Sequence, residues 1–115
     1  MCGKIFLVFF LHKIVKQQTM QTSEQIEHKL KTIKPFLIEN FSVSKIGYFG
    51  SYANEEQNEQ SDLDLLVEFS RPIGWSFFTL EQFLEERFGV KVDLVTPQAI
   101  KAPLKENILQ QVRFV

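Results

Sequence analysis

Three aspartates and a glycine-serine pair have the residue types and spacing of a site that handles phosphate groups. Asp62 and Asp64 flank a single leucine in the stretch SDLDLLVEF, and ten residues separate this pair from Gly50 and Ser51. If the stretch is a strand, both aspartates project to the same side, because successive side chains alternate between faces. Mg²⁺ relieves the repulsion between such carboxylates and keeps positions open for phosphate oxygens. The pair therefore predicts a magnesium site for phosphoryl transfer.

The other half of the predicted site is the glycine-serine pair, joined by a third carboxylate. Gly50 lets the backbone turn tightly after a strand, and Ser51 can offer its amide and hydroxyl to a phosphate at a helix start. Asp93 lies in the apolar segment VKVDLV, where a charge is costly without a partner. We expect Asp93 to be the third ligand that two metal ions require. Taken alone, each feature is also common in turns and helix caps, so the hypothesis depends on their combination.

The elements that must position these residues include three predicted strands. Residues Val43–Phe49 and residues 90–95 have the composition of short strands. Residues Leu63–Phe69 are apolar on both alternating faces apart from Asp64 and Glu68, as expected of an interior strand that is covered on both sides. We interpret Glu68 as a solvated strand end, without a role in the site.

A first helix is predicted to start near Ser23. Thr22 and Gln25 stand at capping-box spacing, and apolar residues follow at intervals of three or four. Pro35 is expected to kink or restart this helix, and Asn40 is a plausible end.

Two further helices are predicted after the interior strand. Apolar residues at helical spacing follow Ser76, and Gly89 stands where a C-terminal cap belongs. Pro103 can open a last helix that runs through Gln111. We expect Trp75, beside the second helix, to form a lid over the core.

Composition limits the class of protein. The chain has 115 residues, of which 44% are hydrophobic, so it can form one domain with a real core. Its 13 Lys and Arg residues against 14 Asp and Glu residues give no basic field for a nucleic-acid backbone, so direct nucleic-acid binding is not expected. Cys2 cannot form an internal disulfide, and His12 and His28 have no partner at zinc-ligand spacing. These features are typical of a cytoplasmic protein without structural zinc.

The first nineteen residues differ from the rest because residues 5–11 form an unbroken apolar run between basic flanks. The run is shorter than the roughly 20 residues needed to span a bilayer, and no small-residue cleavage site follows it. We expect residues 1–19 to be an extension outside the core, with Met20 as the natural start. The domain would then span residues 20–115, with no association with a membrane.

The motifs FGSYA, SDLDLLVEF and KVDLVTP together resemble those of minimal nucleotidyltransferase domains in the DNA polymerase beta superfamily. The similarity runs over residues 23–115. It implies an α/β (α+β) nucleotidyltransferase fold, with a small mixed sheet and helices packed against it. By the same resemblance, Asp62 and Asp64 bind the metal ions, Asp93 completes the triad and acts as or beside the base, and Gly50 with Ser51 holds the phosphates.

The resemblance also implies a biological setting. Such domains commonly act as antitoxins of HEPN ribonuclease toxins, using Mg²⁺ and ATP to transfer AMP to a tyrosine hydroxyl of the toxin. Two alternatives remain open. One is an antitoxin that works by binding alone, and the other is a nucleotidyltransferase that modifies a small molecule such as an aminoglycoside.

One departure from the family pattern bears on activity. An arginine and a glycine usually follow the Gly-Ser-x-Ala motif, whereas this chain has Asn54 and Glu55. The change removes a cation near the expected phosphates and weakens the stabilisation of transition-state charge. Lys101 and Lys105 are candidates to replace that cation.

Overall fold

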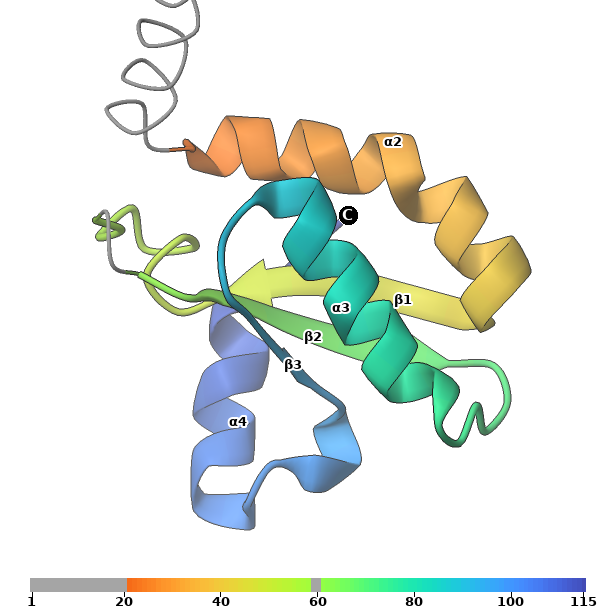
Figure 1. Ribbon diagram of the computed structural model, residues 1–115. Helices are drawn as coiled ribbons and strands as arrows, with labels where there is room; N and C mark the ends of the chain where they lie inside the picture. Colours follow the sequence, from red (N-terminus) through yellow and green to blue (C-terminus); the bar gives the residue numbers. More distant parts are fainter. Residues whose placement is uncertain (1–20, 59–60) are drawn as a thin grey trace, which may run out of the picture.

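The computed structural model describes residues 21–58 and 61–115, in which helices pack against a mixed sheet (Figure 1). The strand order is β3-β2-β1-β4. β1 is antiparallel to β2 and β4, whereas β2 and β3 are parallel. The strands are β1 (Val43–Phe49), β2 (Leu63–Phe69), β3 (Val92–Val95) and β4 (Arg113–Phe114), and the helices are α2 (Ser23–Phe41), α3 (Ser76–Phe88), the 3₁₀ helix η1 (Pro97–Ala99) and α4 (Ala102–Gln111). The predicted α/β class is confirmed.

Most predicted elements are found where the sequence pattern placed them. The first two strands match their predicted bounds, and α4 ends at Gln111 as predicted. The third strand starts at Val92, later than predicted, and the two-residue strand β4 has no counterpart among the predictions. The extension expected over residues 1–19 and His12 within it lie outside the described residues. In the described part of the chain, no helix is long and apolar enough to cross a membrane.

The start and end of α2 have local causes. The capping box is present, since the amide of Gln25 donates to Thr22 Oγ1 at 3.1 Å and the amide of Thr22 donates to Gln25 Oε1 at 2.9 Å. Pro35 lies inside the helix and does not end it. The helix continues one residue past Asn40 and stops where Ser42 adopts a left-handed conformation with φ of 57°.

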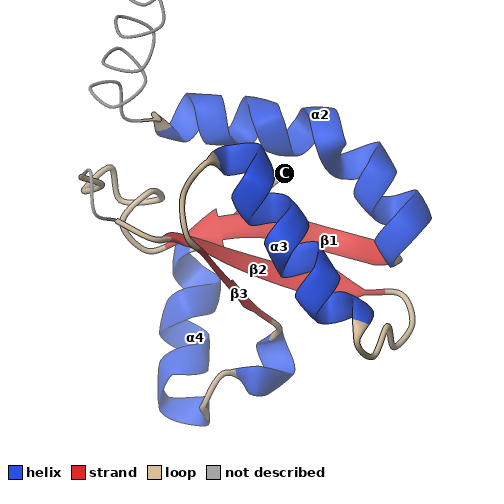
Figure 2. Ribbon diagram, viewed as in Figure 1, coloured by secondary structure: helices blue, strands red, loops and turns tan. Residues whose placement is uncertain are grey.

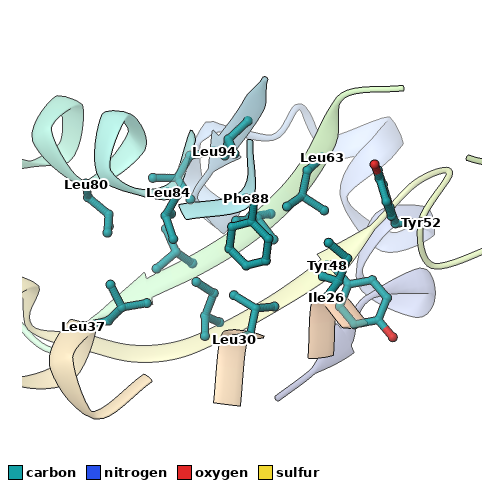
Figure 3. Close-up of a cluster of buried hydrophobic side chains, with 14 of the residues drawn as sticks. Ile26, Leu30, Leu37, Tyr48, Tyr52, Leu63, Leu80, Leu84, Phe88 and Leu94 are labelled. Carbon is teal, nitrogen blue, oxygen red and sulfur yellow. The ribbon is translucent and has the colours of Figure 1, made fainter. Parts of the chain in front are cut away.

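The hydrophobic core lies on one face of the sheet, beneath α2 and α3 (Figure 3). Alternate residues of β2 point toward this core, and β1 and β3 contribute in the same way. The two helices supply apolar stripes at helical spacing. The buried members are Ile26, Leu30 and Leu37 from α2, Leu80, Leu84 and Phe88 from α3, Val43, Ile46, Tyr48, Leu63, Leu65, Val67, Val92 and Leu94 from the strands, and Tyr52 and Ala53 from the turn after β1.

The opposite face of the sheet is covered in part by the C-terminal end of α4. Figure 2 shows α2 and α4 on opposite sides of the strands. Leu66 of β2 is fully buried but does not belong to the core cluster. A Cβ atom at Gly47, which pairs with Leu66, would lie 2.7 Å from Val112 Cγ1 and 2.7 Å from the carbonyl oxygen of Arg113. The absence of a side chain at Gly47 therefore lets the end of α4 and β4 approach this face.

The expectation that Trp75 covers the core is wrong. Its side chain is 85% exposed and contacts Phe78, with ring centroids 5.8 Å apart. The physical reason is helical phase. Because successive helical residues are rotated by about 100°, Trp75 lies roughly 140° from the buried stripe that starts at Leu80.

Replacing Gly47 with alanine should destabilise the domain. The new methyl group would overlap backbone as well as side-chain atoms, so β4 and the end of α4 must shift, at a cost of about 1–3 kcal/mol. Thermal unfolding of Gly47→Ala beside Ser44→Ala, an exposed position on the same strand, measures the effect. Ser44→Ala should stay within about 0.5 kcal/mol of the parent protein. Equal melting temperatures for both variants would contradict the packing described for Gly47.

Candidate active site

Asp64 and Asp93 lie side by side on the face of the sheet that points away from α2 and α3. They are paired in register across the parallel strands β2 and β3. Their neighbours Leu63, Leu65 and Leu94 belong to the core, so the two aspartates project to the other side. Adjacent strands are about 4.8 Å apart, which brings both carboxylates into one small region. The structure therefore unites two of the predicted site residues.

The electrostatic environment of Asp64 links all three predicted carboxylates. Burial, and to a smaller extent the negative charges of Asp93 and then Asp62, together raise the pKa of Asp64 from its ordinary value of 3.8 to about 6. Asp62 is exposed and directly precedes β2. Because like charges shift a pKa only when they are close, Asp93 and Asp62 both lie near Asp64. Asp64 is the half-buried centre of the three.

Gly50 leaves room for the carboxylate of Asp64. It directly follows β1 and has a positive φ of 70°, which glycine adopts without strain. A Cβ atom at this position would overlap Oδ2 of Asp64. The glycine is thus needed twice, for the turn and for the position of the neighbouring carboxylate.

Ser51 begins a turn that is packed against the start of α2. The amide of Asn54 donates to the carbonyl of Gly50 at 3.0 Å, and the amide of Glu56 donates to the carbonyl of Ser51 at 2.8 Å. No regular helix starts at Ser51, so the expected helix start is wrong. The hydroxyl of Ser23 donates to the carbonyl of Tyr52 and holds the turn in place.

The side chains that depart from the family pattern point into solvent. Asn54 and Glu55 are both exposed, and Glu55 has a left-handed φ of 59°. This conformation strains any residue other than glycine, which is the residue that the family pattern has there. Lys101 precedes α4 and Lys105 lies within it. No ion pair joins either lysine to an aspartate in the described part of the chain, so their role as replacement cations stays a hypothesis.

The aspartates fit a metal ion that is bound together with a nucleotide. Among residues 21–58 and 61–115, no three His, Cys, Asp or Glu side chains converge closely enough to hold a metal ion by themselves. Mg²⁺ is usually held by one or two carboxylates together with waters and substrate phosphates. The adjacent carboxylates of Asp64 and Asp93, with Asp62 nearby, provide such a donor set.

Two residues that support the site escaped the sequence analysis. Ser23 contacts the turn 29 positions further along the chain, and no local pattern reveals such a contact. Gly47 did carry a signal, because a glycine inside a strand often marks the close approach of another backbone. His28, for which no role was predicted, is exposed on α2.

Replacing Asp64 with asparagine should stabilise the metal-free protein at neutral pH. Because the folded state raises the pKa of Asp64 to about 6, ionisation of this carboxyl opposes folding, and stability is lost as the pH rises through 6. After allowance for solvent screening of a half-exposed group, we expect a gain of about 1 kcal/mol. Urea unfolding in EDTA at pH 7.5 and pH 5 measures it. The gain should shrink at pH 5, and an equal gain at both values would contradict the assignment.

Replacing Glu55 with glycine should also stabilise the domain. Glycine adopts the left-handed conformation without strain, so Glu55→Gly removes a cost of about 1 kcal/mol. The matched control is Glu56→Gly, since Glu56 is exposed next to Glu55 and does not have a positive φ. Glu56→Gly should lower the melting temperature, whereas Glu55→Gly should raise it by a few degrees. A fall for both variants would show that the turn has another backbone conformation.

Comparisons with known proteins identify the family. The family described as "Nucleotidyltransferase domain" matches residues 30–115. Protein adenylyltransferase MntA of Thermococcus cleftensis is 41% identical over 97 residues, which cover 84% of this chain and 98% of the relative. A relative from Methanocaldococcus jannaschii that is assigned as the protein adenylyltransferase MJ0128 is 44% identical over 98 residues, which cover 84% of this chain and 100% of the relative. The chain thus matches these relatives over almost their whole length.

Solved structures support the same relationship. A structure assigned as a minimal nucleotidyltransferase superimposes with a TM-score of 0.70 at 28% identity, covering 83% of this chain and 97% of the other. A toxin-antitoxin complex with AMP-PNP contains a chain that matches with a TM-score of 0.62 at 27% identity, covering 75% of this chain and 70% of the other. Together, the family match over residues 30–115, the relatives and the fold confirm the resemblance seen in the sequence motifs, and the chain belongs to the nucleotidyltransferase domain family of enzymes as a minimal member.

Proposed function

We propose that this protein transfers AMP from ATP to a hydroxyl group of a partner protein, namely a tyrosine of a HEPN ribonuclease toxin that it thereby neutralises. The observation that carries the proposal is the pairing of Asp64 with Asp93 beside Asp62 and the Gly50 turn. Two further observations support it. Relatives that match over almost their whole length include one named protein adenylyltransferase MntA, and a similar chain occurs in a toxin-antitoxin complex with AMP-PNP.

In the proposed reaction, the acceptor oxygen forms a bond to the α-phosphorus of ATP while the bond to pyrophosphate breaks. Mg²⁺, when bound, would neutralise charge on the phosphates and on the leaving group. Asp62, Asp64 and Asp93 would hold the metal, as two ions if all three carboxylates bind. Asp93, which is exposed, would act as or beside the base that accepts the proton released by the acceptor hydroxyl. The turn at Gly50 and Ser51 would bind the phosphates of the nucleotide.

The size of the domain favours a protein acceptor over a small molecule. Two relatives are matched over 100% and 98% of their length by only 98 and 97 aligned residues, so these relatives consist of this domain alone. Enclosing a small acceptor such as an aminoglycoside usually requires a second domain. A partner protein, in contrast, brings its own surface and positions its own hydroxyl group.

The principal competing function is an antitoxin that neutralises its partner by binding alone. The exposed Asn54 and Glu55 favour this alternative, because they place no cation on the turn. The two functions differ in stoichiometry. An enzyme neutralises many toxin molecules in turn, whereas a binder needs at least one copy for each toxin.

Asp64→Asn separates the two functions. It keeps the shape of the side chain while removing a negative metal ligand, so transfer of labelled AMP from ATP to the toxin should fall by about 10³-fold or more. Binding of the toxin should survive, and the variant should be at least as stable as the parent protein in EDTA. Glu68→Gln is the matched control, since Glu68 is a half-buried carboxylate on the same strand and face.

The measurement that separates the two functions is neutralisation of the toxin by a substoichiometric amount of this protein. The parent protein and Glu68→Gln should neutralise a molar excess of toxin when ATP and Mg²⁺ are present, and Asp64→Asn should not. If Asp64→Asn neutralises the toxin as well as the parent protein at equal low dose, the catalytic function must be abandoned. Label found only on a small molecule would instead exclude a protein acceptor.

A further inference from the structure

The start of α2 is hydrogen-bonded to two connections that lead into the candidate active site. One joins β1 to β2, and it contains the turn at Gly50 and Ser51 and ends at Asp62. The other joins α3 to β3, the strand that carries Asp93. In Figure 1, the first turn of α2 lies near both connections. The start of α2 is therefore placed to determine where the two sides of the site lie relative to each other.

The turn is fixed by Ser23, the first residue of α2. Ser23 is buried, and its hydroxyl donates to the main-chain carbonyl of Tyr52, the residue after Ser51. Tyr52 is also buried, so water has little access to this carbonyl when the serine hydroxyl is removed. A buried carbonyl without a donor is unfavourable, and the planar peptide unit would have to rotate to find another donor. Such a rotation would move the turn.

Gln21, two residues before Ser23, is hydrogen-bonded to both connections. Its main-chain carbonyl accepts from Nε2 of Gln57, in the connection between β1 and β2, at 3.2 Å. Its own Nε2 donates to the main-chain carbonyl of Phe88, the last residue of α3, at 2.6 Å. Oε1 of Gln21 accepts from Nζ of Lys29 at 2.7 Å, so both ends of its side-chain amide are bonded. One residue thus joins segments that are 36 and 67 positions away along the chain.

The α3 end of this network is anchored in the core close to Asp93. Phe88 is buried, and Nζ of Lys29 lies 5.7 Å from the centroid of its ring. The amide of Leu63 donates to the carbonyl of Lys91 at 2.8 Å, which ties the connection between α3 and β3 to the start of β2. Asp93 is two residues beyond Lys91. A segment that is bonded to Phe88 is therefore held in place relative to this aspartate.

We propose that Ser23 and Gln21 are positioning residues for the transfer of AMP, and we call the pair the helix-start clamp. The clamp fixes the turn at Gly50 and Ser51 relative to Asp93, and neither of its residues needs to touch the substrate. The inference rests on the proposed function, because it requires that the turn binds the phosphates of the nucleotide. Such positioning has a large effect, since a displacement of about 1 Å can cost about 100-fold in rate.

The competing explanation is that the clamp only stabilises the fold, and Thr22 supplies the matched control. Thr22 lies between the two clamp residues, and its hydroxyl accepts from the amide of Gln25 in the same helix. Thr22→Ala removes this cap and should lower the melting temperature. It leaves the hydrogen bonds from the clamp to the two connections in place.

The first measurement is calorimetric binding of ATP in the presence of Mg²⁺. Ser23→Ala places a good helix former at its position, so the variant should fold. Its Kd for ATP should be at least about 10-fold higher than that of the parent protein. Ser23→Cys keeps the size of the side chain but offers a weaker donor, and it should also weaken binding. Thr22→Ala should bind ATP within about 2-fold of the parent protein, although it is less stable.

The second measurement is amide hydrogen exchange of the protein without nucleotide. The amides of Asn54 and Glu56 donate to the carbonyls of Gly50 and Ser51, so their exchange reports opening of the turn. Exchange at both amides should be faster in Ser23→Ala than in the parent protein. Thr22→Ala should leave these two rates unchanged.

The two measurements distinguish failure of the clamp from failure of the proposed function. If the parent protein binds ATP and Ser23→Ala binds it equally well, the clamp is wrong and the function stands. An equal loss of affinity in Thr22→Ala would also overturn the clamp. If the parent protein binds no ATP but exchange in the turn is faster in Ser23→Ala alone, Ser23 positions the turn and the proposed function is wrong.

Discussion

The parallel pairing of β2 with β3 holds two carboxylates side by side, and the architecture of the domain accommodates their repulsion. Asp64 and Asp93 face each other across the pair, and the main-chain hydrogen bonds of the ladder prevent them from moving apart. A parallel pair needs a crossover connection, which α3 provides. Because α3 packs with α2 on the other face, neither of these helices covers the two carboxylates.

β1 shapes the site through two glycines, one within the strand and one directly after it. Gly50 leaves space that the carboxylate of Asp64 occupies, and Gly47 leaves space for the end of α4. A larger residue at either position would displace a neighbouring group from the carboxylate face. The strand thus controls which groups meet there, although it supplies none of the three carboxylates.

The sequence was sufficient to predict features that depend on local periodicity or on a specific motif. The capping box at Thr22 and the apolar run of β2 are predictable because short-range contacts determine them. Trp75 was misplaced because its environment depends on the phase of α3 relative to the core. The contact from Ser23 to the turn and the pairing of β4 with β1 join distant parts of the chain. No local pattern encodes such contacts, so the fold itself had to be known.

The half-buried carboxylate of Asp64 creates a conflict between the stability of the fold and the proposed chemistry. Its raised pKa means that the charged form, which a metal site requires, is the form that the fold disfavours. Mutation of Asp64 to an uncharged residue of similar size would therefore be favoured by folding stability. Most proteins tolerate such stabilising substitutions. A chain that had lost all need for the carboxylate would have no thermodynamic reason to keep it. Asp64 is repelled by the neighbouring carboxylates, so selection for folding alone would remove it. Selection for catalysis would maintain it.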